Sequence, residues 1–131
     1  MLQQVKELAE GLHFSKHLGI ELVSAESDHV VLRLPYAEHL GVERINGGAI
    51  SALADIAATC AFWSHAEVGA DSRGATVGFS INFLRLVAAG DLTATASVRR
   101  RGGSICVGEV SVSSEAGEEI AIATVTYKLD P

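Results

Sequence analysis

Hydrophobic and polar residues follow a period of two along most of the chain. Between residues 74 and 87, for example, Phe79 and Ile81 fall on one predicted face and Thr76 and Ser80 on the other. This period is typical of a strand with one buried face. The predicted strands are 19–25, 29–34, 74–87, 91–99, 104–114 and 118–129.

One segment, 49–63, has no polar face wide enough for a surface helix. Six of its fifteen residues are alanine and most of the others are apolar, which predicts a slim helix that is buried on most sides. A short amphipathic helix is expected over residues 1–10. Short turns between strands favour antiparallel neighbours, so we expect an α+β fold in which one antiparallel sheet wraps around a long central helix, with residues 1–131 forming a single domain.

Three polar residues interrupt the predicted long helix at a spacing of four: Ser51, Asp55 and Thr59. This stripe is either a solvated face or the lining of a cleft in which Asp55 acts as a base, and the spacing alone leaves both open. The glycine pair Gly47-Gly48 stands just before the helix. Glycines allow a close backbone approach, and a helix N-terminus offers free N–H donors, so this turn is suited to bind an oxyanion or another anion.

Composition narrows the class of protein. The chain has 131 residues, 48% of them hydrophobic, but no apolar run approaches the roughly 20 residues of a membrane-spanning helix. A formal net charge of −6 argues against nucleic-acid binding. Because the first residues do not resemble a secretory signal, we expect a cytoplasmic protein without a nucleic-acid or membrane partner. The high apolar content favours a homo-oligomer.

The cysteines and histidines form no recognisable redox or metal-binding motif. Cys60 and Cys106 form no CxxC motif and are expected to be reduced core thiols. The five histidines show no metal-ligand spacing, so we expect no metal site.

Over nearly its whole length the chain resembles the hotdog-fold acyl-CoA thioesterases, in the branch of the phenylacetate-degradation thioesterase. The resemblance is carried by Asn46-Gly47-Gly48 followed by Leu53-Ala54-Asp55, and by a second block, 74–86, that contains Phe83-Leu84-Arg85. It implies a hotdog fold and hydrolysis of an acyl-CoA thioester to a free acid and CoA. It also implies a homodimer or homotetramer, with no cofactor beyond the CoA of the substrate.

The resemblance implies roles for individual residues. The Gly47 backbone N–H would bind the thioester oxygen, and Asp55 of the facing subunit would be the catalytic carboxylate, acting as nucleophile or as general base. Asn46 and Gly48 would lie beside the substrate. The hydroxyl that relatives place near the carboxylate would come from Thr59 or Thr76, and we favour Thr59 because helical spacing brings it close to Asp55.

Four arginines are candidates for the CoA phosphates, because guanidinium groups form forked bonds with phosphate; the alternative is that they are solubilising charges. They are Arg85, Arg99, Arg100 and Arg101. The chain departs from the family pattern at two positions. Asn46 replaces a frequent histidine and is expected to cap the helix, and Leu40 replaces a frequent Asn or Gln that contacts the carbonyl.

These departures keep a second hypothesis open, a non-catalytic acyl-CoA-binding protein with the same fold. A hydratase or dehydratase is a third, although no His and acid pair supports it. The acyl group and the choice between dimer and tetramer are left open by the sequence.

Overall fold

The computed structural model describes residues 2–131. Six strands form one antiparallel sheet in the order β1-β2-β4-β5-β6-β3. The strands are β1 (Glu21–Glu26), β2 (His29–Leu34), β3 (Arg73–Phe83), β4 (Leu92–Arg101), β5 (Ile105–Ser114) and β6 (Glu119–Asp130). The helices and helical turns are α1 (Leu2–Lys6), η1 (Glu7–Gly11), α2 (His13–Leu18), η2 (Glu38–Leu40) and α3 (Gly47–Phe62). The sheet and its strands correspond closely to the prediction.

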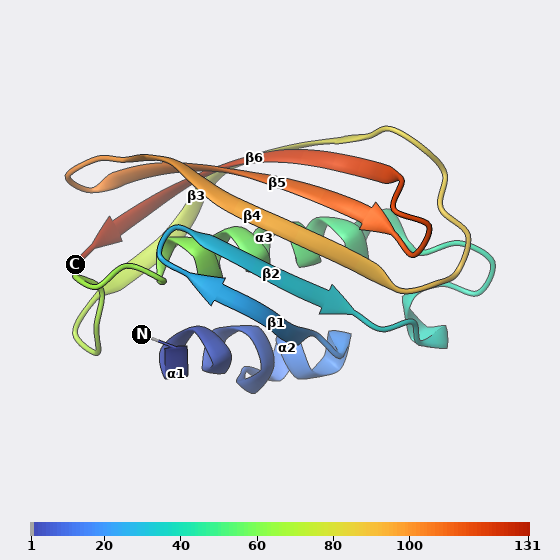
Figure 1. The fold of residues 1–131 in the computed structure, drawn as a ribbon, viewed down its shortest axis with the longest axis horizontal. Helices are drawn as coiled ribbons and strands as arrows, with labels where there is room; N and C mark the ends of the chain where they lie inside the picture. Colours follow the sequence, from blue (N-terminus) through green and yellow to red (C-terminus); the bar gives the residue numbers. More distant parts are fainter. Residues whose placement is uncertain (1) are drawn as a thin grey trace.

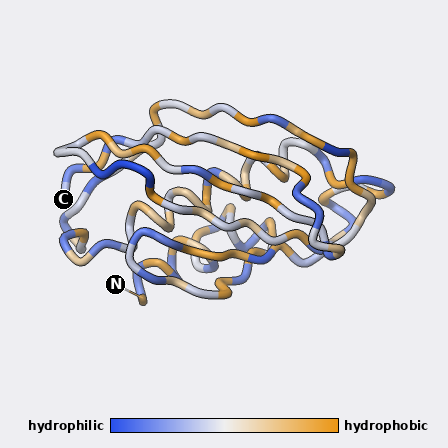
Figure 2. Tube along the Cα trace, turned by 45° about the horizontal axis from the view of Figure 1, so that its top comes forward, coloured by the Kyte–Doolittle hydropathy of each residue, from blue (hydrophilic) through white to orange (hydrophobic). Residues whose placement is uncertain are grey.

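The long helix α3 lies against one face of the curved sheet (Figure 1). Apolar and polar residues alternate along the strands (Figure 2), and in β6 the side chains of Ala121, Val125 and Tyr127 are buried. The ring of Phe62 packs so closely on β5 that a Cβ on Gly108 would lie 3.0 Å from its Cζ atom. This sheet around one central helix is the expected hotdog fold, and no helix within residues 2–131 is long and apolar enough to span a membrane.

The N-terminal segments cover the side of α3 that the sheet leaves open (Figure 1). Val5 and Ala9 are fully buried there. The expected single helix over residues 1–10 is wrong in its extent: within the described residues α1 ends at Lys6, a π-type turn follows, and α2 continues to Leu18. Met1 lies outside the described residues.

The last strand of the sheet, β3, departs most from the prediction. It is an edge strand with only β6 beside it, and nearly all its residues are exposed, so the expectation of a half-buried strand is wrong. The exposed fraction is 38% for Phe79 and 50% for Phe83. An edge with exposed aromatic side chains is a surface available for pairing with another chain.

A β-bulge also changes which residues of β3 share a face. Thr76 pairs with Tyr127, but Gly78 pairs with Thr126, so Val77 is an extra residue in the ladder. The bulge reverses the alternation. Thr76 therefore points to the helix side together with Phe79, whereas strict alternation predicted that the two side chains lie on opposite faces.

Candidate active site

The helix α3 begins at Gly47 because Asn46 caps it. The Asn46 backbone is extended (φ −63°, ψ 136°), and its Oδ1 atom accepts a hydrogen bond from the Gly48 N–H at 2.7 Å. The next two amides, of Ala49 and Ile50, donate to the Asn46 carbonyl oxygen. The expected capping role of Asn46 is confirmed. Within residues 2–131 the Gly47 N–H has no hydrogen-bond partner, so it is the donor of this helix end that is free for a ligand.

A surface hollow of about 460 Å³ is lined in part by Gly47. The side chains around it are mostly apolar, and none of the described residues that line it is acidic. They are Arg44, Ile45, Asn46, Gly47, Ile50, Phe83, Arg85, Leu86 and Val87. A Cβ on Gly47 would lie 3.3 Å from the Cζ atom of Phe83, so glycine keeps the space between helix and ring open.

Asp55 lies two turns further along α3 on its half-exposed side. Its Oδ1 atom accepts a hydrogen bond from the Thr76 hydroxyl at 2.8 Å. No hydrogen bond joins Thr59 to Asp55 among the described residues, so our preference for Thr59 as the hydroxyl partner is corrected in favour of Thr76. The physical reason is the bulge at Val77, which turns Thr76 toward the helix.

Aromatic side chains lie behind this carboxylate. The Trp63 indole N–H donates to the Tyr127 hydroxyl at 2.9 Å, and the Tyr127 ring stacks on Phe62 at a centroid distance of 4.9 Å. Burial raises the pKa of Tyr127; the bond from Trp63 opposes this shift, and the nearby negative charge of Asp55 adds to it. The half-exposed Asp55 therefore lies near these aromatic side chains.

The two candidate groups are well separated within one chain. Gly47 and Asp55 are eight residues apart in a helix, which corresponds to a rise of about 12 Å. Groups that act on one carbonyl must both lie within about 3 Å of the reacting atoms. A single chain therefore cannot direct both groups at the same thioester.

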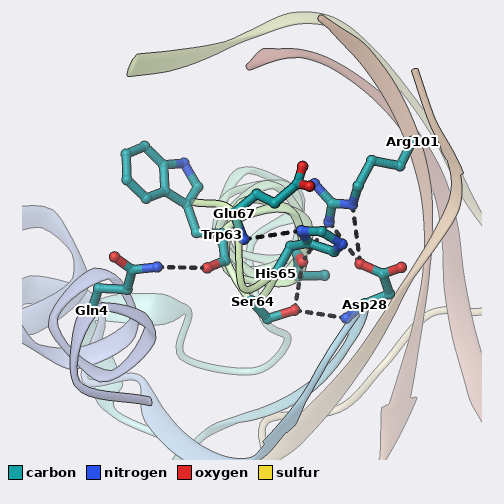
Figure 3. A network of polar contacts seen from close by, with 8 residues as sticks. Gln4, Asp28, Trp63, Ser64, His65, Glu67 and Arg101 are labelled. Carbon is teal, nitrogen blue, oxygen red and sulfur yellow. Dashed lines mark hydrogen bonds and ion pairs between the residues drawn. The ribbon is translucent and has the colours of Figure 1, made fainter. Parts of the chain in front are cut away.

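Arg101, one of the candidate phosphate-binding residues, is part of the fold. Its guanidinium donates to Asp28 Oδ1 at 2.7 and 3.2 Å, and its side chain is only 19% exposed (Figure 3). It also reaches the Ala61 carbonyl, at the opposite end of α3 from Gly47 and about 21 Å along the helix. We therefore assign Arg101 a structural role.

The other candidate arginines are exposed. Arg99 lies 3.8 Å from Glu109 on the outer face of the sheet, and Arg100 follows it on β4. Arg85 alone of the four lines the hollow at Gly47. It also forms an ion pair with Glu118 at 3.2 Å and donates to the Glu119 carbonyl at 2.7 Å.

The comparisons with known proteins agree with this geometry. The sequence profile of the Thioesterase superfamily matches residues 43–121, which include Gly47, Asp55 and Thr76. A candidate esterase of Halobacterium salinarum is 35% identical over 104 residues, which cover 76% of this chain and 68% of the relative. The chain belongs to the Thioesterase superfamily.

Solved structures extend the similarity over most of the chain. A conserved protein of Pseudomonas aeruginosa is 28% identical with a TM-score of 0.82, covering 90% of this chain and 94% of its own. The PaaI protein of E. coli, from the phenylacetic acid degradation operon, is 25% identical with a TM-score of 0.85, covering 97% and 91%. The hotdog thioesterase fold is thus confirmed, and the PaaI protein is among the proteins that this chain resembles.

The position where many superfamily members carry an Asn or Gln is closed in this chain. Leu40 is 2% exposed and belongs to the core, so its side chain offers nothing to a ligand. Beside it, a ring nitrogen of His39 contacts the His17 carbonyl oxygen at 2.6 Å. The expected core thiols are confirmed: Cys60 and Cys106 are free and buried, and burial raises the pKa of the Cys60 thiol to about 12.

Arg44 was not among the site residues predicted from the sequence. It lines the hollow together with Gly47 and is exposed. Its position could have predicted this, because it stands three residues before the glycine pair. Three residues span at most about 10 Å, which keeps its backbone near the turn.

Proposed function

We propose that this member of the Thioesterase superfamily hydrolyses an acyl-CoA thioester at a site formed by two subunits. Membership of the superfamily indicates a thioester hydrolase. The observation that carries the finer proposal is the free Gly47 N–H at the edge of an apolar hollow. It is suited to donate a hydrogen bond to the thioester oxygen and so stabilise the negative charge that this oxygen gains when the carbonyl is attacked.

In the proposed reaction Asp55 of the second subunit supplies the carboxylate. As a general base it removes a proton from water, whose oxygen adds to the carbonyl; as a nucleophile it adds directly and forms an anhydride that water then cleaves. In both routes the tetrahedral oxyanion collapses, the carbon–sulfur bond breaks, and CoA leaves as a thiolate that takes up a proton. The Thr76 hydroxyl orients the carboxylate in either route.

Two observations support a second subunit. The distance of about 12 Å between Gly47 and Asp55 in one chain is too long for joint action on one carbonyl. The edge strand β3, which contacts both groups, exposes Val77, Phe79 and Phe83. We propose a homodimer, alone or paired into a tetramer, and the two reduced cysteines are compatible with the cytoplasm.

The proposal is tested by CoA release from a panel of acyl-CoA thioesters. Asp55→Asn should keep the fold and lower kcat by at least about 10²-fold, as is typical for a positioned base. Asp71→Asn, the same change at an exposed turn, is the matched control and should retain the wild-type rate. Equal rates for Asp55→Asn and the wild type would remove Asp55 from catalysis.

The shared site has its own test. An Asp55→Asn subunit and a subunit altered at Gly47 are each inactive, but a mixed dimer contains one site with both native groups. Mixing under conditions of demonstrated subunit exchange should therefore restore part of the activity. No recovery would place the site within one chain.

A second candidate function is acyl-CoA binding without turnover. It is favoured by the burial of Leu40, because its apolar side chain adds no donor beside Gly47. Tight binding of acyl-CoA with no CoA release from any thioester of the panel would establish this alternative.

A further inference from the structure

Arg44 is the charged residue nearest in sequence to the free Gly47 amide that also lines its hollow. Its side chain is exposed, and within residues 2–131 it has no carboxylate partner. Arg33, Arg85 and Arg101, by contrast, each form an ion pair. An unpaired guanidinium at a ligand-sized hollow is a ready partner for a carboxylate or a phosphate.

The backbone around Arg44 is held in place at both ends. The Asn46 N–H donates to the Leu40 carbonyl at 2.7 Å, and Gly41 lies so close that a Cβ on it would be 1.9 Å from the Arg44 carbonyl oxygen. With a φ of 141°, position 41 strongly favours glycine. On the other side Arg44 bridges to Ala88 of the loop after β3. Arg44 is thus presented from a fixed turn.

The hollow is electropositive although the chain carries a formal net charge of −6. Its described lining contains two arginines and no acidic residue, and the N-terminal end of α3 adds a positive partial charge. Its other walls include Ile45, Ile50 and Leu86. An apolar surface with a cationic group at its rim fits a hydrocarbon segment that ends in an anion.

The distance from the thioester oxygen decides which anion of the substrate Arg44 can bind. Arg44 and Gly47 are three residues apart, so their backbones lie at most about 10 Å from each other. The pantetheine arm between the sulfur and the first phosphate of CoA has the backbone length of four to five residues, roughly 15 Å when extended. Arg44 and Gly47 line one hollow of about 460 Å³, so with the thioester oxygen at Gly47 an acyl group inside the hollow lies beside Arg44, whereas an extended pantetheine arm carries the CoA phosphates out of it.

We propose that Arg44 is a specificity-determining residue and that the hollow accepts a short acyl group ending in a carboxylate. The preferred substrates are then thioesters of dicarboxylic acids, in the size range from succinyl to adipyl. This inference rests on the proposed function, since it places the thioester oxygen at Gly47. Arg85 lines the same hollow, but its ion pair with Glu118 offsets its charge, so the carboxylate is recognised by Arg44.

The test compares acyl groups of equal length with and without the terminal carboxylate, such as glutaryl and valeryl. For the wild type the ratio of kcat/KM for the carboxylated over the neutral CoA thioester should exceed about ten. Arg44→Gln should lower this ratio about 10- to 100-fold, the usual effect of losing a hydrogen bond to a charged group. The matched control is Arg73→Gln, which removes the same charge at the far end of β3 and should leave the ratio unchanged.

Two further arms identify the anion and separate this inference from the proposed function. N-acetylcysteamine thioesters lack the CoA phosphates, and the ratio measured with them should fall in the same way in Arg44→Gln. If Arg44→Gln instead weakens both CoA thioesters equally and spares the N-acetylcysteamine thioesters, Arg44 binds a phosphate and the inference is overturned. Binding of non-hydrolysable glutaryl and valeryl thioethers tests the role of Arg44 without turnover. Equal dissociation constants for the two thioethers would overturn the inference. Tighter binding of the glutaryl thioether by a protein that hydrolyses no thioester would refute only the proposed function.

Discussion

The two ends of α3 differ in how their polar groups are satisfied. At the C-terminal end the Trp63 carbonyl accepts from the Gln4 amide at 2.9 Å, and the Ala61 carbonyl accepts from the Ser64 hydroxyl at 2.7 Å. That hydroxyl in turn accepts from the Asp28 N–H (Figure 3). At the N-terminal end the Gly47 N–H has no partner within residues 2–131.

This difference separates structural residues from candidate functional ones. Buried polar groups are normally hydrogen-bonded, so a closed network stabilises the fold and has no capacity left for a ligand. A free amide beside an apolar hollow contributes little to the fold and can bind an oxygen of a substrate. Substitutions at the C-terminal end should therefore change stability, and substitutions at the N-terminal end should change catalysis.

Gly47→Pro should have the largest effect, because it removes the free N–H itself. Gly47 is the first helical residue, where proline is tolerated, and the extended Asn46 backbone is compatible with a following proline. We expect kcat to fall about 10²- to 10³-fold, the typical loss for one oxyanion donor. Steady-state CoA release measures the rate, and circular dichroism checks the helix.

Gly47→Ala is the matched control for this substitution. It adds a Cβ near Phe83 but keeps the N–H, so it reports the steric part of the effect alone. The difference between the two variants isolates the donor. If Gly47→Ala and Gly47→Pro lower kcat equally, crowding rather than the amide explains the loss, and the contrast between the two helix ends breaks down.

Arg101→Met tests the C-terminal end of α3, where the polar groups are hydrogen-bonded to one another. Removing a mostly buried guanidinium that donates twice to Asp28 should lower the free energy of unfolding by about 2 kcal/mol, with kcat unchanged. Urea unfolding measures the stability. The neighbouring Arg100→Met, at an exposed position, should stay within about 0.5 kcal/mol of the wild type. A raised KM for acyl-CoA without loss of stability would return Arg101 to the substrate phosphates.

The fold was predictable because its patterns are local. The period of two located the strands to within a few residues, and the alanine-rich apolar segment located α3 because no polar face could lie in water. The N-terminal region was less predictable. A helix over residues 1–10 is interrupted by a π-type turn, and packing of Val5 and Ala9 on α3 decides this rather than local propensity.

The site was predictable only where it depends on a single helix. The Asn46 cap follows from its position just before α3, whereas the catalytic roles of Gly47 and Asp55 came from the family resemblance and stay predictions. Thr76 was ranked too low because one inserted residue at Val77 reverses the face of the strand, and alternation cannot reveal a bulge. The role of Arg101 depends on Asp28, which lies 73 residues away in sequence and meets it only through pairing of distant strands.

Thr76→Ala tests the hydrogen bond to Asp55 near the middle of α3. The Thr76 hydroxyl holds Asp55 Oδ1 at 2.8 Å, and losing this bond should lower kcat about tenfold, equivalent to about 1.4 kcal/mol. Thr76→Ser retains a hydroxyl and should recover most of the rate. Thr59→Ala should change kcat by less than about twofold. A larger loss for Thr59→Ala than for Thr76→Ala would show that the carboxylate is oriented along the helix and not by β3.

The smallest effect is expected for Asn46, whose side-chain oxygen caps the N-terminal end of α3. Asn46→Ala removes the cap on Gly48 and should lower the free energy of unfolding by about 1 kcal/mol while preserving the Gly47 donor. Asn46→Asp keeps a capping oxygen but places a negative charge beside the developing oxyanion, so stability should be retained and kcat should fall roughly three- to tenfold. Urea unfolding and CoA release on both variants therefore separate the two properties at one position. If Asn46→Ala reduces kcat more than Asn46→Asp does, the Asn46 side-chain amide itself contacts the substrate. The N-terminal end of α3 then has a side-chain donor in addition to the Gly47 N–H.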